Sequence, residues 1–396
     1  MNNFTYVERE KTAKIKVIGI GGAGGNAINN MVASNLLGVD FIAANTDSQA
    51  LEISKAAIKI QIGGKLTEGL GAGANPSVGR DAAMETADAI RRVLEGSHMV
   101  FLTAGFGGGT GTGATPIIAE ICKEIGALTV AVVTRPFSFE GKKRAKQAEE
   151  GISILKDVAD TVITIPNDRL RGIAPKNAKM LEMFKKADEI LHHSVKGITD
   201  LIMVPGLVNL DFADVRTTMS KAGMALMGIG VASGENRARE AAERAISHPL
   251  LEDISISGAR GVLMNITCTS DMTLDEMTEA SDRIYEEVGD EAEIIWGQAI
   301  DESLGDEMRV TVIATGIDAE NYSRKSESRV KEQLRGKVRD ITPDDLKHAS
   351  AFEEPTFIRH QKAVGEESGA SYRGFKGIVL DKDDLDIPTF LRRKAD

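Results

Sequence analysis

The sequence predicts an α/β fold in which a doubly wound, mostly parallel sheet is followed by a long central helix and a second, α+β domain. Short runs rich in valine and isoleucine alternate with helical stretches between residues 14 and 165, and they show little polar alternation, as is typical of strands buried on both faces. A long stretch with one apolar face then leads into further strand-like and helical segments. At 396 residues, the chain is longer than one compact core usually holds, so two domains and a tail are expected.

The strands and helices of both halves can be placed by their apolar patterns. In the first half the expected strands are residues 14–20, 39–45, 58–62, 99–104, 127–134 and 161–165, with helices that include 80–94 and 142–157. A long helix follows, whose apolar residues step by three and four from Met180 to Ile202 until Pro205-Gly206 ends it. In the second half, strands at 224–232, 261–268 and 308–317 alternate with helices at 236–247 and 274–288, in an order that the pattern leaves open.

Composition narrows the class of protein. The formal net charge is -11 and there is no large basic block, which disfavours nucleic acid as a partner. Cys122 and Cys268 are far apart and form no CxxC pair, so neither a disulfide framework nor a zinc site is expected. The N-terminus has no apolar signal core, and no apolar run approaches the roughly 20 residues that span a bilayer. A cytoplasmic protein without direct membrane insertion is therefore expected.

Two glycine-rich loops follow expected strands and precede helices. The first, GIGGAGGN at residues 19–26, contains the GxGxxG pattern through Gly19, Gly21 and Gly24. Glycines let the backbone approach a phosphate closely, and a helix N-terminus offers unpaired N–H groups and a positive dipole end. Because this pattern equally suits an NAD-binding Rossmann site, an NAD-dependent oxidoreductase stays open as an alternative, with an acid such as Asp40 or Asp47 further on.

The second loop, AGFGGGTGTGA at residues 104–114, holds more glycines than a tight turn requires. It lacks the lysine of a Walker A loop. In the common strand order 3-2-1-4-5-6, the first and fourth strands are neighbours at the topological switch point, where ligands bind. The two loops would then face one crevice, and two helix N-termini aimed at one place suit a polyphosphate.

The GGGTGTG run from Gly107 to Gly113 resembles the signature of the tubulin/FtsZ family of GTPases, and the resemblance extends from about Ala13 to the C-terminus. It implies a GTPase domain that binds GTP or GDP and hydrolyses GTP, in a protein that polymerises head to tail into filaments at the mid-cell division ring. It also implies Mg²⁺ held through the nucleotide phosphates, with K⁺ as a candidate second cation. Adjacent His192 and His193 point to different faces of a helix, so no metal site made of protein side chains is expected.

The resemblance also implies which residues bind the nucleotide. The segment GLGAGANP at residues 69–76 is similar to the loop that senses the γ-phosphate, and PFSFEGKKR at 136–144 to the ribose and phosphate segment. IPND and FKKAD are similar to the nucleoside and base contacts. The implied set is Gly21, Gly22, Asn26, Ala72, Gly73, Gly107, Gly108, Gly109, Thr110, Gly111, Thr112, Gly113, Glu140, Arg144, Asn167, Phe184 and Asp188.

The proposed base contacts also make chemical sense. Phe184 and Asp188 are four residues apart and so share one helix face. A phenylalanine can stack on a purine, and a carboxylate can accept the paired N–H donors of guanine, which adenine lacks. The residues alone also allow a plainer interpretation, in which Phe184 belongs to the apolar stripe and Asp188 is a solvated surface acid.

The segment NLDFADVR at residues 209–216 begins a helix after the turn at Pro205-Gly206. From the residues alone, Asp211 suits an N-cap, and Asp214 suits the acid of a capping box. The resemblance instead implies that Asn209, Asp211 and Asp214 are catalytic and orient the attacking water on the nucleotide of a neighbouring subunit. Hydrolysis would then require assembly, and head-to-tail contacts that do not close build an open filament.

Beyond about Ala319, charged and small polar residues predominate, which predicts a disordered linker. It ends in LDIPTFLRRK, from Leu385 to Lys394, which resembles the peptide that docks onto membrane-tethering and regulatory division proteins such as the actin-like FtsA. A merely solubilising tail is the alternative. The expected division is a flexible N-terminus (1–12), a GTP-binding domain (13–176), the central helix (177–204), the catalytic loop and its helix (205–222), the α+β domain (223–318), the linker (319–384) and the docking peptide (385–396).

Overall fold

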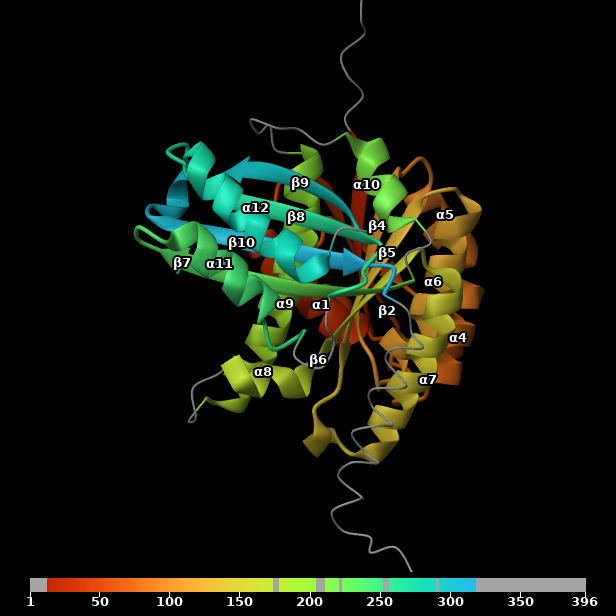
Figure 1. The fold of residues 1–396 in the computed structure, drawn as a ribbon. Helices are drawn as coiled ribbons and strands as arrows, with labels where there is room; N and C mark the ends of the chain where they lie inside the picture. Colours follow the sequence, from red (N-terminus) through yellow and green to blue (C-terminus); the bar gives the residue numbers. More distant parts are fainter. Residues whose placement is uncertain are drawn as a thin grey trace, which may run out of the picture. The chain divides into compact units, whose positions relative to one another are not determined.

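The computed structural model describes residues 13–173, 178–203, 211–220, 223–251, 256–289 and 292–317. Asn209, the N-terminal segment, the linker and the peptide from Leu385 to Lys394 lie outside the described residues. The described residues belong to one compact unit. Within it, one sheet runs through both halves of the chain in the order β3-β2-β1-β4-β5-β6-β7-β10-β8-β9 (Figure 1). The finer domain boundaries given above stay a prediction.

The first half of the sheet is parallel throughout. Its order confirms the predicted 3-2-1-4-5-6 arrangement, with β1 and β4 as neighbours. Every residue of β4 except the last is buried, as a strand covered on both faces requires. The strands are β1 (Ile15–Ile20), β2 (Val39–Asn45), β3 (Ile58–Gln61), β4 (Met99–Gly105), β5 (Leu128–Arg135) and β6 (Thr161–Pro166).

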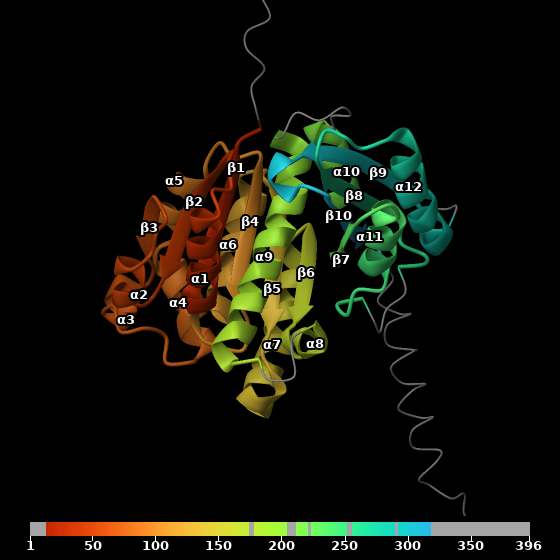
Figure 2. The same ribbon diagram turned by 90° about the vertical axis from the view of Figure 1, so that its left-hand side faces the viewer.

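Helices cover both faces of this parallel part. The side chains of α1 pack with those of the central helix α9 (Met180–Met203) on one face, and helices α4 to α7 contribute to a second core on the other. Figure 2 shows α9 running between α1 and the second half of the chain, as predicted for a helix that crosses between domains. In chain order, the other helices of the first half are α1 (Gly21–Ala33), α2 (Ser48–Glu52), α3 (Gly64–Thr67), α4 (Pro76–Glu85), α5 (Ala87–Leu94), α6 (Thr110–Glu124), the short η1 (Ser138–Glu140), α7 (Lys142–Val158) and α8 (Asn167–Ile173).

The single helix predicted over residues 80–94 is wrong, because the chain forms two helices that meet at Thr86. The Thr86 hydroxyl accepts a hydrogen bond from the Gly63 N–H at 2.9 Å and donates to the Ala82 carbonyl at 3.2 Å. A threonine side chain that bonds to the backbone in this way competes with the helical hydrogen bonds. The helix therefore breaks where Thr86 bonds to a residue from a distant turn.

The second half continues the same sheet through β7. Only Thr161–Ile163 of β6 pair with Gly223–Ala225 of β7, in parallel, whereas β10 pairs antiparallel with both β7 and β8. Helices α11 and α12 pack over the second half and form a third core. The elements are α10 (Phe212–Met219), β7 (Gly223–Ser233), α11 (Arg237–Ile246), β8 (Gly261–Cys268), α12 (Leu274–Val288), β9 (Glu293–Ile300), η2 (Glu302–Leu304) and β10 (Glu307–Thr315).

Strand β9 was not expected from the sequence. Its residues EIIWGQAI pair in parallel with β8 at the edge of the sheet. Most of the first four are only partly buried, and Gly297 and Gln298 interrupt the apolar run. An edge strand of this composition carries neither the apolar run nor the alternation that identifies a strand. Among the described residues, every helix is too short or too polar to cross a membrane.

Candidate functional site

The two glycine loops meet at the carboxyl ends of β1 and β4. These strands pair in parallel with Ile20 opposite Ala104, and α1 and α6 begin at Gly21 and Thr110 directly beyond them. A Cβ atom on Gly21 would come within 3.0 Å of the Gly111 nitrogen, so the two helix N-termini lie in contact. One place therefore receives unpaired N–H groups and the positive dipole ends of two helices.

Several glycines of these loops are required by the fold itself. A Cβ atom would lie 2.4 Å from the Thr103 carbonyl oxygen at Gly24, 2.8 Å from the Ala72 Cβ at Gly109, and 1.9 Å from the Pro76 carbonyl oxygen at Gly113. Gly107 instead adopts a φ of +100°, which disfavours other residues.

Neither requirement applies to Gly22, Gly25 and Gly108. A Cβ atom at each would meet nothing within 4 Å, and none of the three has a positive φ. The folded chain alone therefore does not explain them. A ligand that must approach the backbone closely does explain them, since a side chain would occupy its place. Gly25 was missed by sequence reasoning, although it lies within the first loop.

Two threonines of the second loop maintain its shape. The Thr112 hydroxyl, on a side chain only 3% exposed, accepts a hydrogen bond from the Gly107 N–H at 2.9 Å. The Thr110 hydroxyl lies 2.7 Å from that of Thr46, which follows β2. Thr46 was missed by sequence reasoning. Its position just after a strand that neighbours the switch point could have identified it.

Segments far along the chain border the second loop. A Cβ atom on Gly107 would lie 3.0 Å from the Arg144 carbonyl oxygen, so Arg144 packs beside the loop. Its guanidinium donates to Glu140 Oε2 at 2.7 Å, while Glu140 Oε1 accepts from the Phe137 N–H at 2.9 Å. Ala72 is buried against Gly109, and Gly73 has a φ of +57° with open space on its Cβ side.

Phe184 and Asp188 lie near the start of α9, where the sequence places the base. The Phe184 ring packs edge-on against Phe137, with 5.4 Å between ring centroids, and remains 38% exposed. Asp188 Oδ2 accepts a hydrogen bond from Asn30 Nδ2 at 3.1 Å. Burial raises the pKa of Asp188 to about 6, which does not fit a solvated surface acid. Asn167, at the end of β6, is 5% exposed, and its Oδ1 has no hydrogen-bond partner among the described residues.

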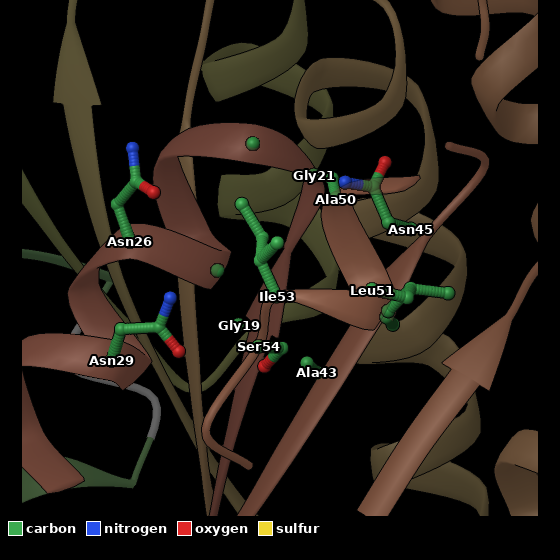
Figure 3. A pocket seen from close by; sticks show the side chains of 13 residues that line it. Gly19, Gly21, Asn26, Asn29, Ala43, Asn45, Ala50, Leu51, Ile53 and Ser54 are labelled. Atoms are coloured by element: carbon green, nitrogen blue, oxygen red, sulfur yellow. The ribbon is translucent and has the colours of Figure 1, made fainter. Parts of the chain in front are cut away.

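A cavity of about 90 Å³ lies beside the first glycine loop (Figure 3). Asn26 and Asn29 of α1 lie on one side of it and Asn45 at the end of β2 on the other, with Ile53 between them. Asn29 Oδ1 also accepts from the Lys55 N–H at 2.6 Å. The amides of Asn26 and Asn45 therefore offer polar contacts at the rim of the loop, and Asn45 was missed by sequence reasoning.

The expected catalytic acids lie at the amino ends of the parallel strands, opposite the glycine loops at their carboxyl ends. Asp211 Oδ1 accepts from the Asp214 N–H at 2.8 Å, which confirms Asp211 as the N-cap of α10. Phe212 packs on His98 with 6.1 Å between ring centroids, and Arg216 Nη2 donates to the Gly126 carbonyl at 3.3 Å. His98 and Gly126 precede β4 and β5, so α10 lies at the amino ends of these strands, whereas α8 follows the carboxyl end of β6 (Figure 1).

The length of the strands separates these acids from the glycine loops of the same chain. Strand β4 has 7 residues, and a strand advances about 3.3 Å per residue, so the amino and carboxyl ends of the strands are roughly 20 Å apart. Asp211 and Asp214 therefore cannot reach a ligand on the glycine loops of their own molecule. Asn209, the third expected catalytic residue, lies outside the described residues.

The remaining titratable groups with shifted pKa values include two adjacent histidines and a cysteine, all in buried or half-buried positions. Burial lowers the pKa of His192 to about 4 and that of His193 to about 3, so both are neutral packing residues near pH 7. Burial raises the pKa of the Cys122 thiol to about 12. Within the described residues, no group of three or more His, Cys, Asp and Glu side chains is placed to hold a metal ion.

A doubly wound α/β sheet with two helix N-termini meeting over open glycines defines a nucleotide-phosphate-binding protein. Residues 14–175 match the model of the GTPase domain of the Tubulin/FtsZ family, and residues 223–318 match that of the FtsZ family C-terminal domain. The chain belongs to the Tubulin/FtsZ family.

The chain is similar to cell division proteins over nearly its whole length. The cell division protein FtsZ of Coxiella burnetii is 51% identical over 97% of both chains. That of Pseudomonas putida is 49% identical over 96% of this chain and 97% of its own. A solved FtsZ of M. jannaschii is 47% identical, with a TM-score of 0.76 over 78% of this chain and 90% of that one. The oxidoreductase alternative is not favoured, because both halves match GTPase-family models.

Proposed function

We propose that this chain is a GTPase that polymerises head to tail for cell division and completes each active site between two subunits. Guanine nucleotide binding and GTP hydrolysis follow from the family's GTPase domain. Cell division follows from the relatives named above. The M. jannaschii relative was solved as a dimer, which supports self-association.

The observation that carries the shared site is the separation of its two parts. The open glycines lie at the carboxyl ends of the parallel strands and the acids of α10 at their amino ends. When one subunit places the amino ends of its strands against the carboxyl ends of those in the next, the acids meet the nucleotide of the neighbour. The same contact can repeat at the two free ends of the assembly, which builds an open filament.

The chain's own groups supply much of the positioning that phosphoryl transfer to water requires. Backbone N–H groups of residues 108–112 and of the α1 N-terminus hold the phosphates and stabilise the charge that develops on them. Asp211 and Asp214 of the neighbouring subunit, with Asn209, accept hydrogen bonds from the attacking water and orient it. Once the γ-phosphate has left, the interface loses a charged group that both subunits contact, and it weakens.

Mg²⁺ fits this site as an ion that arrives with the nucleotide. The Thr46 and Thr110 hydroxyls and the Asn45 amide place oxygen donors beside the loop, and oxygen is the ligand that Mg²⁺ prefers. An Mg²⁺ ion held there with the nucleotide would neutralise part of the phosphate charge. K⁺ is a second proposed cation.

We expect phosphate release per molecule to depend steeply on protein concentration. Purified chain is assayed with GTP and Mg²⁺ over a dilution series. If the site is shared, turnover per molecule is negligible when dilute and rises above a threshold at which the chain also sediments. A turnover per molecule that stays constant to the lowest concentration would mean that each chain hydrolyses GTP alone.

The filaments are proposed to lie in the cytoplasm and to form the mid-cell division ring, and the tail is proposed to tether them there by docking the peptide from Leu385 to Lys394 onto FtsA or a similar protein. A chain truncated after Lys382 is expected to keep its GTPase activity and lose binding to FtsA. Co-sedimentation with FtsA measures the binding, and phosphate release provides the control. Undiminished co-sedimentation of the truncated chain contradicts the assignment.

A further inference from the structure

A hydrogen bond joins the first glycine helix to the base end of the central helix. Asn30 Nδ2 on α1 donates to Asp188 Oδ2 on α9 at 3.1 Å, although the residues are 158 positions apart. Asn30 follows Asn26 by four positions, so both amides lie on one face of α1. The face that lines the loop cavity through Asn26 therefore continues to the carboxyl group of Asp188.

The protonation state of Asp188 decides which base edge it complements. An ionised carboxylate offers two acceptors, which match the two adjacent N–H donors of guanine. A protonated carboxyl offers one donor and one acceptor, which match the acceptor and the amino group on the corresponding edge of adenine. A base site that depends on an aspartate therefore discriminates well only while the aspartate stays ionised.

We propose that Asn30 is a positioning residue that holds Asp188 ionised and correctly oriented, and thereby determines the preference for guanine over adenine. The inference rests on the proposed function, which assigns Asp188 to the base. The amide N–H of Asn30 occupies one lone pair of Oδ2. Within the described ranges the Asp188 carboxylate accepts no second hydrogen bond, so its other lone pairs can accept from the base, and the carboxylate plane is fixed before the nucleotide arrives.

The electrostatic surroundings make this support necessary. The pKa of Asp188 is raised to about 6 as the net result of three causes: burial raises it most, the hydrogen bond from Asn30 lowers it, and Glu189 on the same helix raises it. Helix α1, which faces Asp188, contains no charged residue. Asn30 is thus the group on α1 that opposes protonation, and without it the pKa of Asp188 moves toward neutral pH.

The test compares Asn30→Leu, Asp188→Ala and the double variant with the unsubstituted chain. Each protein is kept below the assembly threshold, and GTP and ATP displace a fluorescent GTP analogue between about pH 5.5 and 8. Asn30→Leu is expected to bind GTP about tenfold more weakly at pH 7, as for a lost hydrogen bond to a charged group. Its preference for GTP over ATP narrows, and its loss of GTP binding on acidification begins at a higher pH. The double variant binds as Asp188→Ala does.

The outcomes separate this inference from the proposed function. If Asp188→Ala retains the full preference for GTP, the assignment of Asp188 to the base is wrong. If Asp188→Ala loses the preference but Asn30→Leu retains both the preference and the original pH dependence, only the role of Asn30 is wrong. A loss in the double variant that exceeds that of Asp188→Ala shows that Asn30 acts independently of the carboxylate, which also overturns the inference.

Discussion

Asp214→Asn protein is expected to bind GTP and assemble as the unsubstituted chain does, but to release phosphate at least about 100-fold more slowly. The substitution keeps the size of the side chain and removes the charge that orients water. It leaves the cap of α10 intact, because Asp214 contributes its backbone N–H to that cap rather than its carboxylate. Phosphate release measures the turnover, and sedimentation with GTP measures assembly. Undiminished turnover would refute the role of Asp214.

Asp211 allows capping and catalysis to be separated. Asp211→Ser keeps a side-chain oxygen that can cap α10, whereas Asp211→Ala removes it and costs about 1 kcal/mol of stability. If the carboxylate is catalytic, both variants lose turnover, although only Asp211→Ala lowers the free energy of unfolding in urea. If Asp211→Ser retains full turnover, the acid serves only as a helix cap.

Mixing two inactive proteins tests whether the site is shared. Asp214→Asn chains keep the glycine loops. Chains in which Gly108→Val blocks the nucleotide loop keep the acids. Where a blocked chain presents its acids to the nucleotide of an Asp214→Asn chain, a complete site forms. The mixture should therefore recover part of the turnover that both proteins lack alone. No recovery, in mixtures that co-assemble, would place both halves of the site in one subunit.

The second large effect is expected at Gly108. Gly108→Val should weaken GTP binding at least about 100-fold and leave the free energy of unfolding within about 1 kcal/mol of the original. A Cβ atom here meets no atom of the described residues within 4 Å and no positive φ opposes it, so the substitution is expected to displace the ligand rather than the protein. Equilibrium binding of a fluorescent GTP analogue and urea unfolding measure the two quantities.

Two other glycines provide the controls. Gly172, on α8, is equally open, so Gly172→Val should alter neither GTP binding nor stability appreciably. Gly113→Ala places a Cβ atom 1.9 Å from the Pro76 carbonyl oxygen and should destabilise the fold by several kcal/mol, on the order of an overpacked core. Normal GTP binding by Gly108→Val would contradict a phosphate site at this loop.

The fold could be predicted where buried strands carry continuous apolar runs. Strand β2 agrees with its prediction at both ends, and β1 beside β4 follows from a general rule for doubly wound sheets. The break at Thr86 and the edge strand β9 could not be predicted. The break depends on a hydrogen bond to the distant Gly63, and β9 has only a weak apolar pattern. The order of the second half depends on contacts between segments far apart in the sequence.

The site was predictable to a similar extent. The glycine loops are visible as motifs, and Asp211 as an N-cap is visible from its spacing to Asp214. The base contacts came from the family resemblance rather than from periodicity, which equally allowed packing. The contacts of Thr46 with Thr110 and of Asn30 with Asp188 join residues 64 and 158 positions apart. Such pairs become visible only when the fold has brought their elements together.

The placement of the glycine loops and the acids at opposite ends of the same strands has a consequence for how many sites a filament contains. If each active site is shared between two subunits, as proposed, a filament of n subunits has only n − 1 complete sites, so one terminal subunit holds a nucleotide that no neighbour can hydrolyse. Turnover per subunit therefore follows the ratio (n − 1)/n, one half for a pair and approaching unity for long filaments. The two tips also differ chemically, since one exposes a nucleotide and the other exposes acids. Fragmentation then creates new nucleotide-bearing tips, each of which lowers the total rate by one site.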